Sequence, residues 1–201
     1  DPLIFMYGDG SFSYNNYLVE APCRGQLDLN RITPLDWSGV DIRSESQGKD
    51  QKEDSIQYAF CQKMTREEDF DIIFDDDGKG EAADIIALRR ESNNSVTLVL
   101  VHCKFASSEI PRALIDDFYQ VCGQAQKSVK WKHRGVRELI DHMKRRESRW
   151  QEENKSRFLK GNFTQMRLIE RIARKGGIKL EVRVVQPGLS KQKVSSGIRD
   201  I

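Results

Sequence analysis

The sequence has few of the features that mark several large classes of protein. Its four cysteines are widely spaced and form no Cys-x-x-Cys pair, which excludes a zinc finger or a dense disulfide framework. Its longest apolar runs are only a few residues, as at Val99-Leu100-Val101, so no transmembrane helix is predicted. Neither a Gly-x-Ser-x-Gly elbow nor a P-loop is present.

The N-terminus lacks an initiator methionine and the basic stretch of a secretory signal. We therefore expect a fragment of a longer chain, a cytoplasmic location and reduced thiols. With 201 residues, 32% of them charged and 38% hydrophobic, the chain is expected to form one globular domain, with room for an added arm.

The net charge of +2 conceals a strong asymmetry along the chain. Residues 1–126 carry 12 basic and 23 acidic residues, whereas residues 127–175 carry 16 basic and 6 acidic ones. An acidic half can hold cations and a basic half can hold a polyanion, although solvated helix faces would produce the same counts.

Hydrophobic periodicity predicts an α/β fold with a basic helical insertion. A β-rich segment over 1–49 is expected to pack on a core domain that spans 50–201. A helix is predicted at 54–64, capped by Asp50 or Asp54. The other predicted elements are strands at 70–74, 81–89, 96–105 and 178–185, and helices at 112–129, 135–159 and 163–175.

Two residues of the predicted hairpin carry the chemical argument. Asp84 is expected in the middle of the second strand and Lys104 at the end of the third, which brings them to the same end of the hairpin. His102 and Lys104 share one face of their strand. An unpaired buried charge is very costly, so Asp84 and Glu81 are the expected partners.

Carboxylates at such a position suit Mg²⁺, which binds through one or two carboxylates and retains several waters. A purely structural salt bridge between Asp84 and Lys104 would explain the same pair. The run Asp75-Asp76-Asp77-Gly78 lacks the ligand order of a calcium loop and is interpreted as a turn, of which one Asp could support the metal site.

The runs Gly80-Glu81-Ala82-Ala83-Asp84 and Val101-His102-Cys103-Lys104 resemble the PD-(D/E)XK restriction-endonuclease-like superfamily, and its Mrr-type branch most. The resemblance covers residues 50–130 and the strand at 178–186. It implies an αβββαβ core with a mixed central sheet, which agrees with the order of predicted elements.

The resemblance also implies roles for individual residues. Asp84 would bind the metal and Lys104 would be the catalytic lysine, while His102 stands where the family has Glu, Asp or Gln. Three consequences are open: greater tolerance of Mn²⁺, a missing oxygen supplied by Glu81, or a weaker metal site. A first-helix residue, Glu53 or Gln57, and a polar residue of the helix after the lysine strand, Gln124 or Lys127, would complete the site.

The basic segment predicts a nucleic-acid surface, in which cations contact phosphates and tryptophans stack on bases. Docking of the segment on a neighbouring domain is the alternative. His133 and His142, which have no cysteine partners at metal-binding spacing, are expected to be surface residues of the same segment. The predicted contact residues are Lys127, Lys130, Trp131, Lys132, Lys144, Arg145 and Arg146.

These features together predict an Mg²⁺- or Mn²⁺-dependent DNA endonuclease. The wider pattern, including Glu45-Ser46-Gln47 and Gln186-Pro187-Gly188, resembles nuclease modules of bacterial helicase-type defence proteins. The resemblance thus implies a defence or restriction-type role, a helicase partner and a homodimer, and no membrane partner is expected. The alternative is a catalytically lapsed module that binds nucleic acid and anchors a helicase-type protein.

Overall fold

The computed structural model describes residues 4–6, 12–14, 17–19, 29–110, 115–128 and 130–188. Contacts divide the chain into two compact units, residues 1–34 with 190–201, and residues 35–189. In the first unit, short apolar runs form an antiparallel sheet in the order β1-β2-β3, and a 3-10 helix follows. Its elements are β1 (Ile4–Met6), β2 (Phe12–Tyr14), β3 (Tyr17–Val19) and η1 (Leu29–Arg31).

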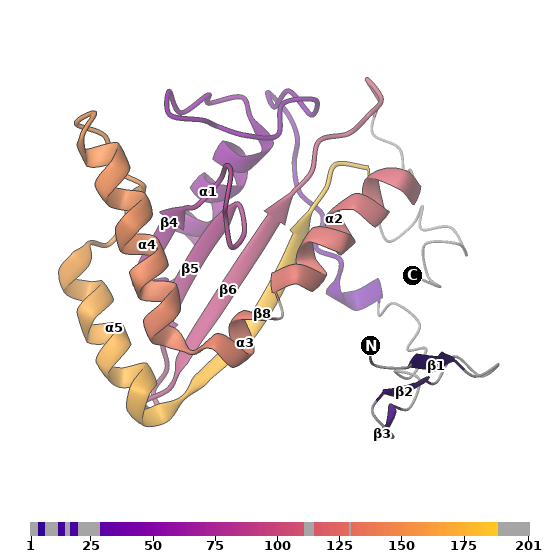
Figure 1. Cartoon of the computed structure of the whole chain (residues 1–201). Coiled ribbons are helices and arrows are strands. Elements are labelled where there is room, and N and C mark those ends of the chain that lie inside the picture. Colours follow the sequence, from indigo (N-terminus) through magenta and orange to yellow (C-terminus); the bar gives the residue numbers. More distant parts are fainter. Residues whose placement is uncertain are drawn as a thin grey trace. The chain divides into compact units, whose positions relative to one another are not determined.

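The second unit is built on a five-stranded mixed sheet in the order β7-β4-β5-β6-β8 (Figure 1). The pairs β7–β4, β4–β5 and β5–β6 are antiparallel, whereas β8 runs parallel to β6. The unit is therefore a mixed α/β structure, as predicted. The strands are β4 (Ile72–Asp75), β5 (Ile85–Arg90), β6 (Val96–Cys103), β7 (Phe158–Lys160) and β8 (Ile178–Val185).

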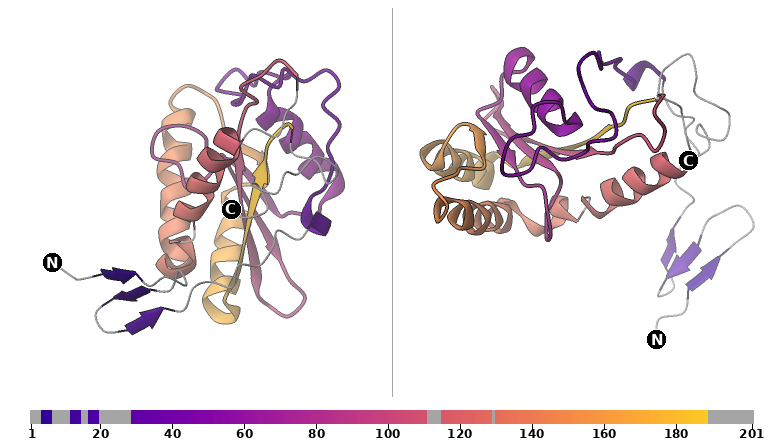
Figure 2. Two further views of the ribbon diagram at one scale, coloured as in Figure 1. Left: turned by 90° about the vertical axis from the view of Figure 1, so that its right-hand side faces the viewer. Right: turned by 90° about the horizontal axis from the view of Figure 1, so that it is seen from above.

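Helices cover both faces of this sheet, as the view from above shows (Figure 2). Helix α1 packs on one face, and α3, α4 and α5 pack on the opposite face. Among the described residues, no helix combines the length and apolar character needed to cross a lipid bilayer. The helices are α1 (Ile56–Glu67), α2 (Ile115–Ser128), α3 (Trp131–Arg134), α4 (Val136–Gln151) and α5 (Phe163–Gly176).

The central strands are buried on both faces because their apolar residues do not alternate with polar ones. Side chains of a strand point alternately to its two faces, so each strand feeds two cores. Even-numbered residues such as Ile86 and Leu100 join the core beneath α4 and α5, and odd-numbered ones such as Ile85 and Val101 join the core beneath α1. The ends of β5 and β6 are thereby held rigidly.

Helix α1 begins at the predicted place but with a different cap. Ser55, rather than Asp50 or Asp54, is the N-cap, and its side chain accepts a hydrogen bond from the backbone N–H of Tyr58. The prediction of an Asp cap is therefore wrong. Starting the helix at Ile56 places Gln57 in the first turn, where its side chain is buried.

The basic segment is part of the core and does not form a separate arm. The single helix predicted over 135–159 is wrong: α4 ends at Gln151, and β7 then pairs with β4 at the edge of the sheet. Phe158 of β7 packs edge-on against Phe74, with ring centroids 5.1 Å apart. Pairing with β4 satisfies the backbone groups of a sheet edge, which a continued helix would leave open.

The turn between β5 and β6 is held against the end of α5. Gly176 closes that helix so tightly that a Cβ there would overlap the backbone carbonyl of Asn94. Only glycine fits at such an approach. This contact fixes the end of the sheet opposite to the one that carries the acidic residues described next.

Candidate metal centre

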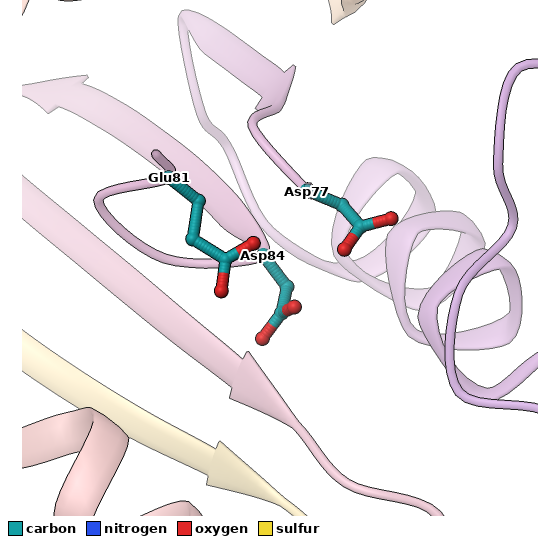
Figure 3. Close-up of side chains that lie close together, drawn as sticks. All are labelled: Asp77, Glu81 and Asp84. Carbon is teal, nitrogen blue, oxygen red and sulfur yellow. The ribbon is translucent and has the colours of Figure 1, made fainter. Parts of the chain in front are cut away.

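Three acidic side chains meet where β4 ends and β5 begins. Asp77, Glu81 and Asp84 each place a carboxylate oxygen so that all three atoms lie within 4.8 Å of one another (Figure 3). The intervening loop is a tight turn in which the N–H of Gly78 donates to Glu81 Oε2 at 2.7 Å. Gly78 has a φ of 108°, a conformation that favours glycine. The turn thus directs Glu81 back toward the two aspartates.

Asp84 is fixed by the strand next to it. It lies one residue before β5 rather than in the middle of a strand, so that part of the prediction is wrong. Its N–H donates to the carbonyl of Val101 at 3.0 Å, and its Oδ2 accepts from the N–H of Cys103 at 2.8 Å. Since Ile85 pairs with Val101, the register carried one residue further sets Asp84 opposite His102 instead of Lys104.

Lys104 follows β6 directly and pairs with an acid that the sequence analysis did not select. Its Nζ lies 3.2 Å from Glu45 Oε2 and 4.2 Å from the centroid of the Phe105 ring. The N–H of Phe105 donates to the same Glu45 oxygen at 3.0 Å. In the described part of the chain, no ion pair joins Lys104 to Asp84, so the alternative of a structural salt bridge between them is wrong. Glu45 sets the position of the ammonium group instead.

The electrostatics of the cluster favour a bound cation. Burial, together with the charges of Glu81, Asp77 and Glu45, raises the pKa of Asp84 to about 8. Burial and the charges of Asp77 and Asp76 also raise the pKa of Glu81. A cation among these oxygens would relieve the repulsion that raises both pKa values. The cluster could therefore hold a metal ion through carboxylate oxygens, which are the ligands of hard divalent cations.

His102 lies behind Asp84, on the side of α2. It is 3% exposed, and its Nε2 lies 2.6 Å from Ser128 Oγ. Its Nδ1 lies 3.7 Å from Asp84 Oδ2. Burial lowers the pKa of His102 to about 4, so the imidazole is neutral at neutral pH. The ring nitrogen that faces Asp84 is thus close to one acid of the cluster, but it does not lie within 4.8 Å of all three carboxylates.

The two first-helix candidates differ sharply in their surroundings. Glu53 is exposed, whereas Gln57 is buried and donates to Asp75 Oδ1 at 3.1 Å and to the carbonyl of Asp84 at 3.2 Å. Gln57 therefore holds the two ends of the acidic loop between β4 and β5 together without adding a charge. Its Oε1 also accepts the N–H of Gln47 at 2.9 Å, which ties the loop that carries Glu45 to the helix.

Two basic residues of α4 bind the same acidic loop through Asp76. Asp76 lies 2.8 Å from His142 Nε2 and 2.7 Å from Arg146 Nε. The guanidinium of Arg146 also donates to the carbonyls of Asp76, Asp77 and Lys79. The prediction of His142 as a surface residue is wrong, and Arg146 is buried within the protein rather than presented to a nucleic acid.

The other predicted nucleic-acid residues are divided between core and surface. Trp131 is 7% exposed and belongs to the core, so its indole is not available to stack on a base. Lys127, Lys130 and Arg145 are exposed, and Lys144 pairs with Asp141 at 3.4 Å. The side chain of Lys132 lies outside the described residues.

Gln124 lies one helical turn before Ser128 and therefore on the same face of α2. It is partly buried, and its Oε1 has no hydrogen-bond partner among the described residues. On this face of α2 the residue that contacts the end of β6 is Ser128, through His102, and the predicted role of Gln124 or Lys127 stays a prediction. The pairing of Glu45 with Lys104 was not predicted, although Glu45 belongs to the run Glu45-Ser46-Gln47.

Comparison with known proteins gives no relative. No family model, no curated protein and no solved structure matches this chain. Any function must therefore be inferred from the sequence and structure of this chain itself.

Proposed function

We propose that this chain is a metal-dependent nuclease domain that hydrolyses phosphodiester bonds, with DNA as its substrate. The observation that carries the proposal is the convergence of Asp77, Glu81 and Asp84 beside the ends of β5 and β6. Lys104 leaves the same end of β6, one residue after the Cys103 N–H that holds Asp84. Acid cluster and lysine therefore come from neighbouring strand ends.

The order of elements supports the same proposal. Helix α1 precedes β4, β5 and β6, helix α2 follows them, and β8 lies parallel beside β6. This order is the one expected from the resemblance to the PD-(D/E)XK superfamily. In that framework Asp84 stands at the metal-binding position and Lys104 at the lysine position. The defence or restriction-type role and the helicase partner belong to the proposal on the resemblance alone.

The residues have distinct parts in such a reaction. Asp77, Glu81 and Asp84 would hold a divalent cation, Mg²⁺ or Mn²⁺, which supplies charge neutralisation at the phosphate and a more acidic water. Lys104, held by Glu45, would donate to the attacking water or to a phosphate oxygen. Exposed Lys127 and Lys130 offer phosphate contacts outside the centre.

The test is a cleavage assay on supercoiled plasmid and single-stranded DNA with Mg²⁺, Mn²⁺ or EDTA. We expect metal-dependent cutting that Asp84→Asn and Lys104→Ala each reduce at least about a hundredfold. Asp69→Asn and Lys160→Ala are matched controls, since Asp69 and Lys160 lie 3.9 Å apart at the surface with an exposed acid. Equal cutting by wild type and both site variants would refute the mechanism.

A catalytically lapsed module that binds nucleic acid is the second candidate. The observation that favours it is His102, which is sealed at 3% exposure where the family has an oxygen ligand. This candidate predicts DNA binding that weakens steeply with salt, and no cutting with either metal. The same assay, run beside a binding measurement, therefore separates the two.

A further inference from the structure

His102 uses only one of its two ring nitrogens, although it is almost fully buried. Its Nε2 contacts Ser128 Oγ, while its Nδ1 has no hydrogen-bond partner among the described residues. Buried side-chain nitrogens are nearly always hydrogen-bonded, so this exception needs an explanation. The carboxylate oxygen Asp84 Oδ2 lies 3.7 Å from this nitrogen.

The hydrogen bonds of Ser128 determine which nitrogen carries the proton. A serine hydroxyl has one proton, and Ser128 donates it to the carbonyl of Ala82 at 3.0 Å. Toward His102 the hydroxyl must therefore accept, which places the ring proton on Nε2. The Nδ1 atom of the neutral ring is left with a free lone pair near Asp84.

A lone pair and a carboxylate oxygen repel each other unless something positive lies between them. A shared proton does not fit, because 3.7 Å is beyond hydrogen-bond distance. A metal ion does fit: with bonds of about 2.0–2.2 Å, two ligands of one ion lie about 3–4 Å apart. Asp84 Oδ2 and His102 Nδ1 are therefore spaced like two ligands of the same cation.

We propose that the metal centre is built for a first-row transition cation of the Mn²⁺ class rather than Mg²⁺, with His102 Nδ1 as a nitrogen ligand beside Asp84. Imidazole nitrogen strengthens binding of transition cations, whereas Mg²⁺ is held by oxygen. Ser128 is the positioning residue, since its bond to Nε2 keeps Nδ1 unprotonated. This inference rests on the metal centre of the proposed function and does not require turnover.

The experiment measures metal binding by the full chain, without DNA. Mn²⁺ is followed by pulsed electron paramagnetic resonance, which detects a directly bonded ¹⁴N, and Mg²⁺ is followed by its competition with Mn²⁺. We expect ¹⁴N coupling in the wild type and at least tenfold tighter binding of Mn²⁺ than of Mg²⁺. His102→Asn places an oxygen near the position of Nδ1, so the coupling should vanish and the preference should fall about tenfold.

Ser128→Ala leaves every ligand in place and tests the positioning role separately. Without the hydroxyl, the proton of His102 is free to move to Nδ1, so Mn²⁺ affinity should fall about tenfold and Mg²⁺ affinity should stay within threefold. Ser148→Ala is the matched control, because Ser148 is exposed and its hydroxyl donates to the Lys144 carbonyl within α4. It should leave both affinities unchanged.

The outcomes distinguish this inference from the proposed function. Mn²⁺ binding that Asp84→Asn abolishes but that shows no ¹⁴N coupling would overturn the role of His102 and leave the metal centre intact. Failure of both Mn²⁺ and Mg²⁺ to bind would overturn the inference and the proposed function together. Nitrogen-coupled Mn²⁺ in a protein that cuts no DNA would support the inference and refute the nuclease.

Discussion

Two sets of acids lie within the same short loop, and their surroundings differ. Asp75 and Asp76 are buried and face partners that neutralise or hydrogen-bond them: Gln47, Gln57 and Arg157 around Asp75, and His142 and Arg146 around Asp76. In the described part of the chain, no lysine or arginine lies within 4.0 Å of the carboxylates of Asp77, Glu81 or Asp84, which instead face one another.

The difference separates residues that build the loop from residues that bind. A buried carboxylate surrounded by fixed cations is satisfied and needs nothing further. Burial raises the pKa of Asp75 too, but Arg157 and the amides of Gln47 and Gln57 lie beside that carboxylate. The carboxylates without cationic partners, whose pKa values burial and neighbouring acids raise, gain most from an added cation. Three consecutive aspartates therefore have two roles, and the basic residues of α4 decide which acids remain free to bind.

The largest change in stability is expected when Asp76, an acid of the first set, loses its charge. Asp76→Asn removes the charge that pairs with His142 and Arg146 and leaves Arg146 buried without its partner. We expect a loss of about 3–5 kcal/mol in the free energy of unfolding, measured with urea. Asp69→Asn, which changes an exposed carboxylate, should stay within about 0.5 kcal/mol. Equal stability of the two variants would contradict the structural role of Asp76.

The cationic side of the same contact gives the next largest effect. Arg146→Ala should cost about 3 kcal/mol, since the buried guanidinium bonds three backbone carbonyls and Asp76. Its neighbour Arg145 is exposed, so Arg145→Ala should change stability by less than about 0.5 kcal/mol.

For DNA binding, unlike for stability, Arg145→Ala should have a larger effect than Arg146→Ala. In the folded state, Arg145→Ala should lower the salt dependence of DNA binding by about one charge. Binding measured across a salt series would test this, and an unchanged slope would remove Arg145 from the nucleic-acid surface.

Much of the fold was predictable because hydrophobic periodicity is a local signal. Helix α5 and strand β8 begin where the sequence predicts them, and the antiparallel order of β4, β5 and β6 follows from short connecting turns. The break between α4 and β7 was not predictable. Residues 152–157 carry no strong helix-stop signal, and β7 is stabilised by pairing with β4, a partner far away in the sequence.

The candidate site was predicted in part for the same reason. Asp84 and Glu81 lie in a predicted strand, so their closeness follows from the hairpin, whereas Lys104 pairs with Glu45 instead of Asp84. Glu45 could not be placed, because it lies in an irregular loop 60 residues before Phe105, whose N–H it binds. Arg146 was misassigned since sequence shows the charge of a helix but not which of its faces is buried.

Loss of a carboxylate from the second set, Asp77, Glu81 and Asp84, should stabilise the metal-free protein, whereas loss of the Asp76 carboxylate should destabilise it. At neutral pH the folded metal-free protein must keep a proton on Asp84 that the unfolded chain releases, which costs stability. Asp84→Asn removes this cost, so the metal-free protein should gain about 1 kcal/mol of stability at neutral pH. The same change should abolish the rise in melting temperature that Mn²⁺ produces in the wild type. Thermal unfolding with Mn²⁺ or EDTA measures both effects. A destabilised variant that still responds to Mn²⁺ would place Asp84 with the structural acids.

The smallest effect is the pH dependence of that gain. The pKa of Asp84 is about 8 in the folded protein against an ordinary value of 3.8, so the folded state holds this proton more tightly than the unfolded state. Stability of the metal-free protein must then fall as pH rises from about 4 to about 8, because only the unfolded chain releases the proton freely in that range.

The difference in unfolding free energy between Asp84→Asn and wild type isolates this group from all others. With EDTA present, this difference should increase with each pH unit from pH 5 to pH 8 by a fraction of its value at neutral pH. Above pH 8 it should level off. With saturating Mn²⁺ the sign should reverse, since binding requires the ionised carboxylate and stabilises the wild type more as pH rises. A difference that is flat with pH in EDTA would mean that Asp84 is already neutralised by the protein, as Asp76 is, and that the two sets of acids do not differ.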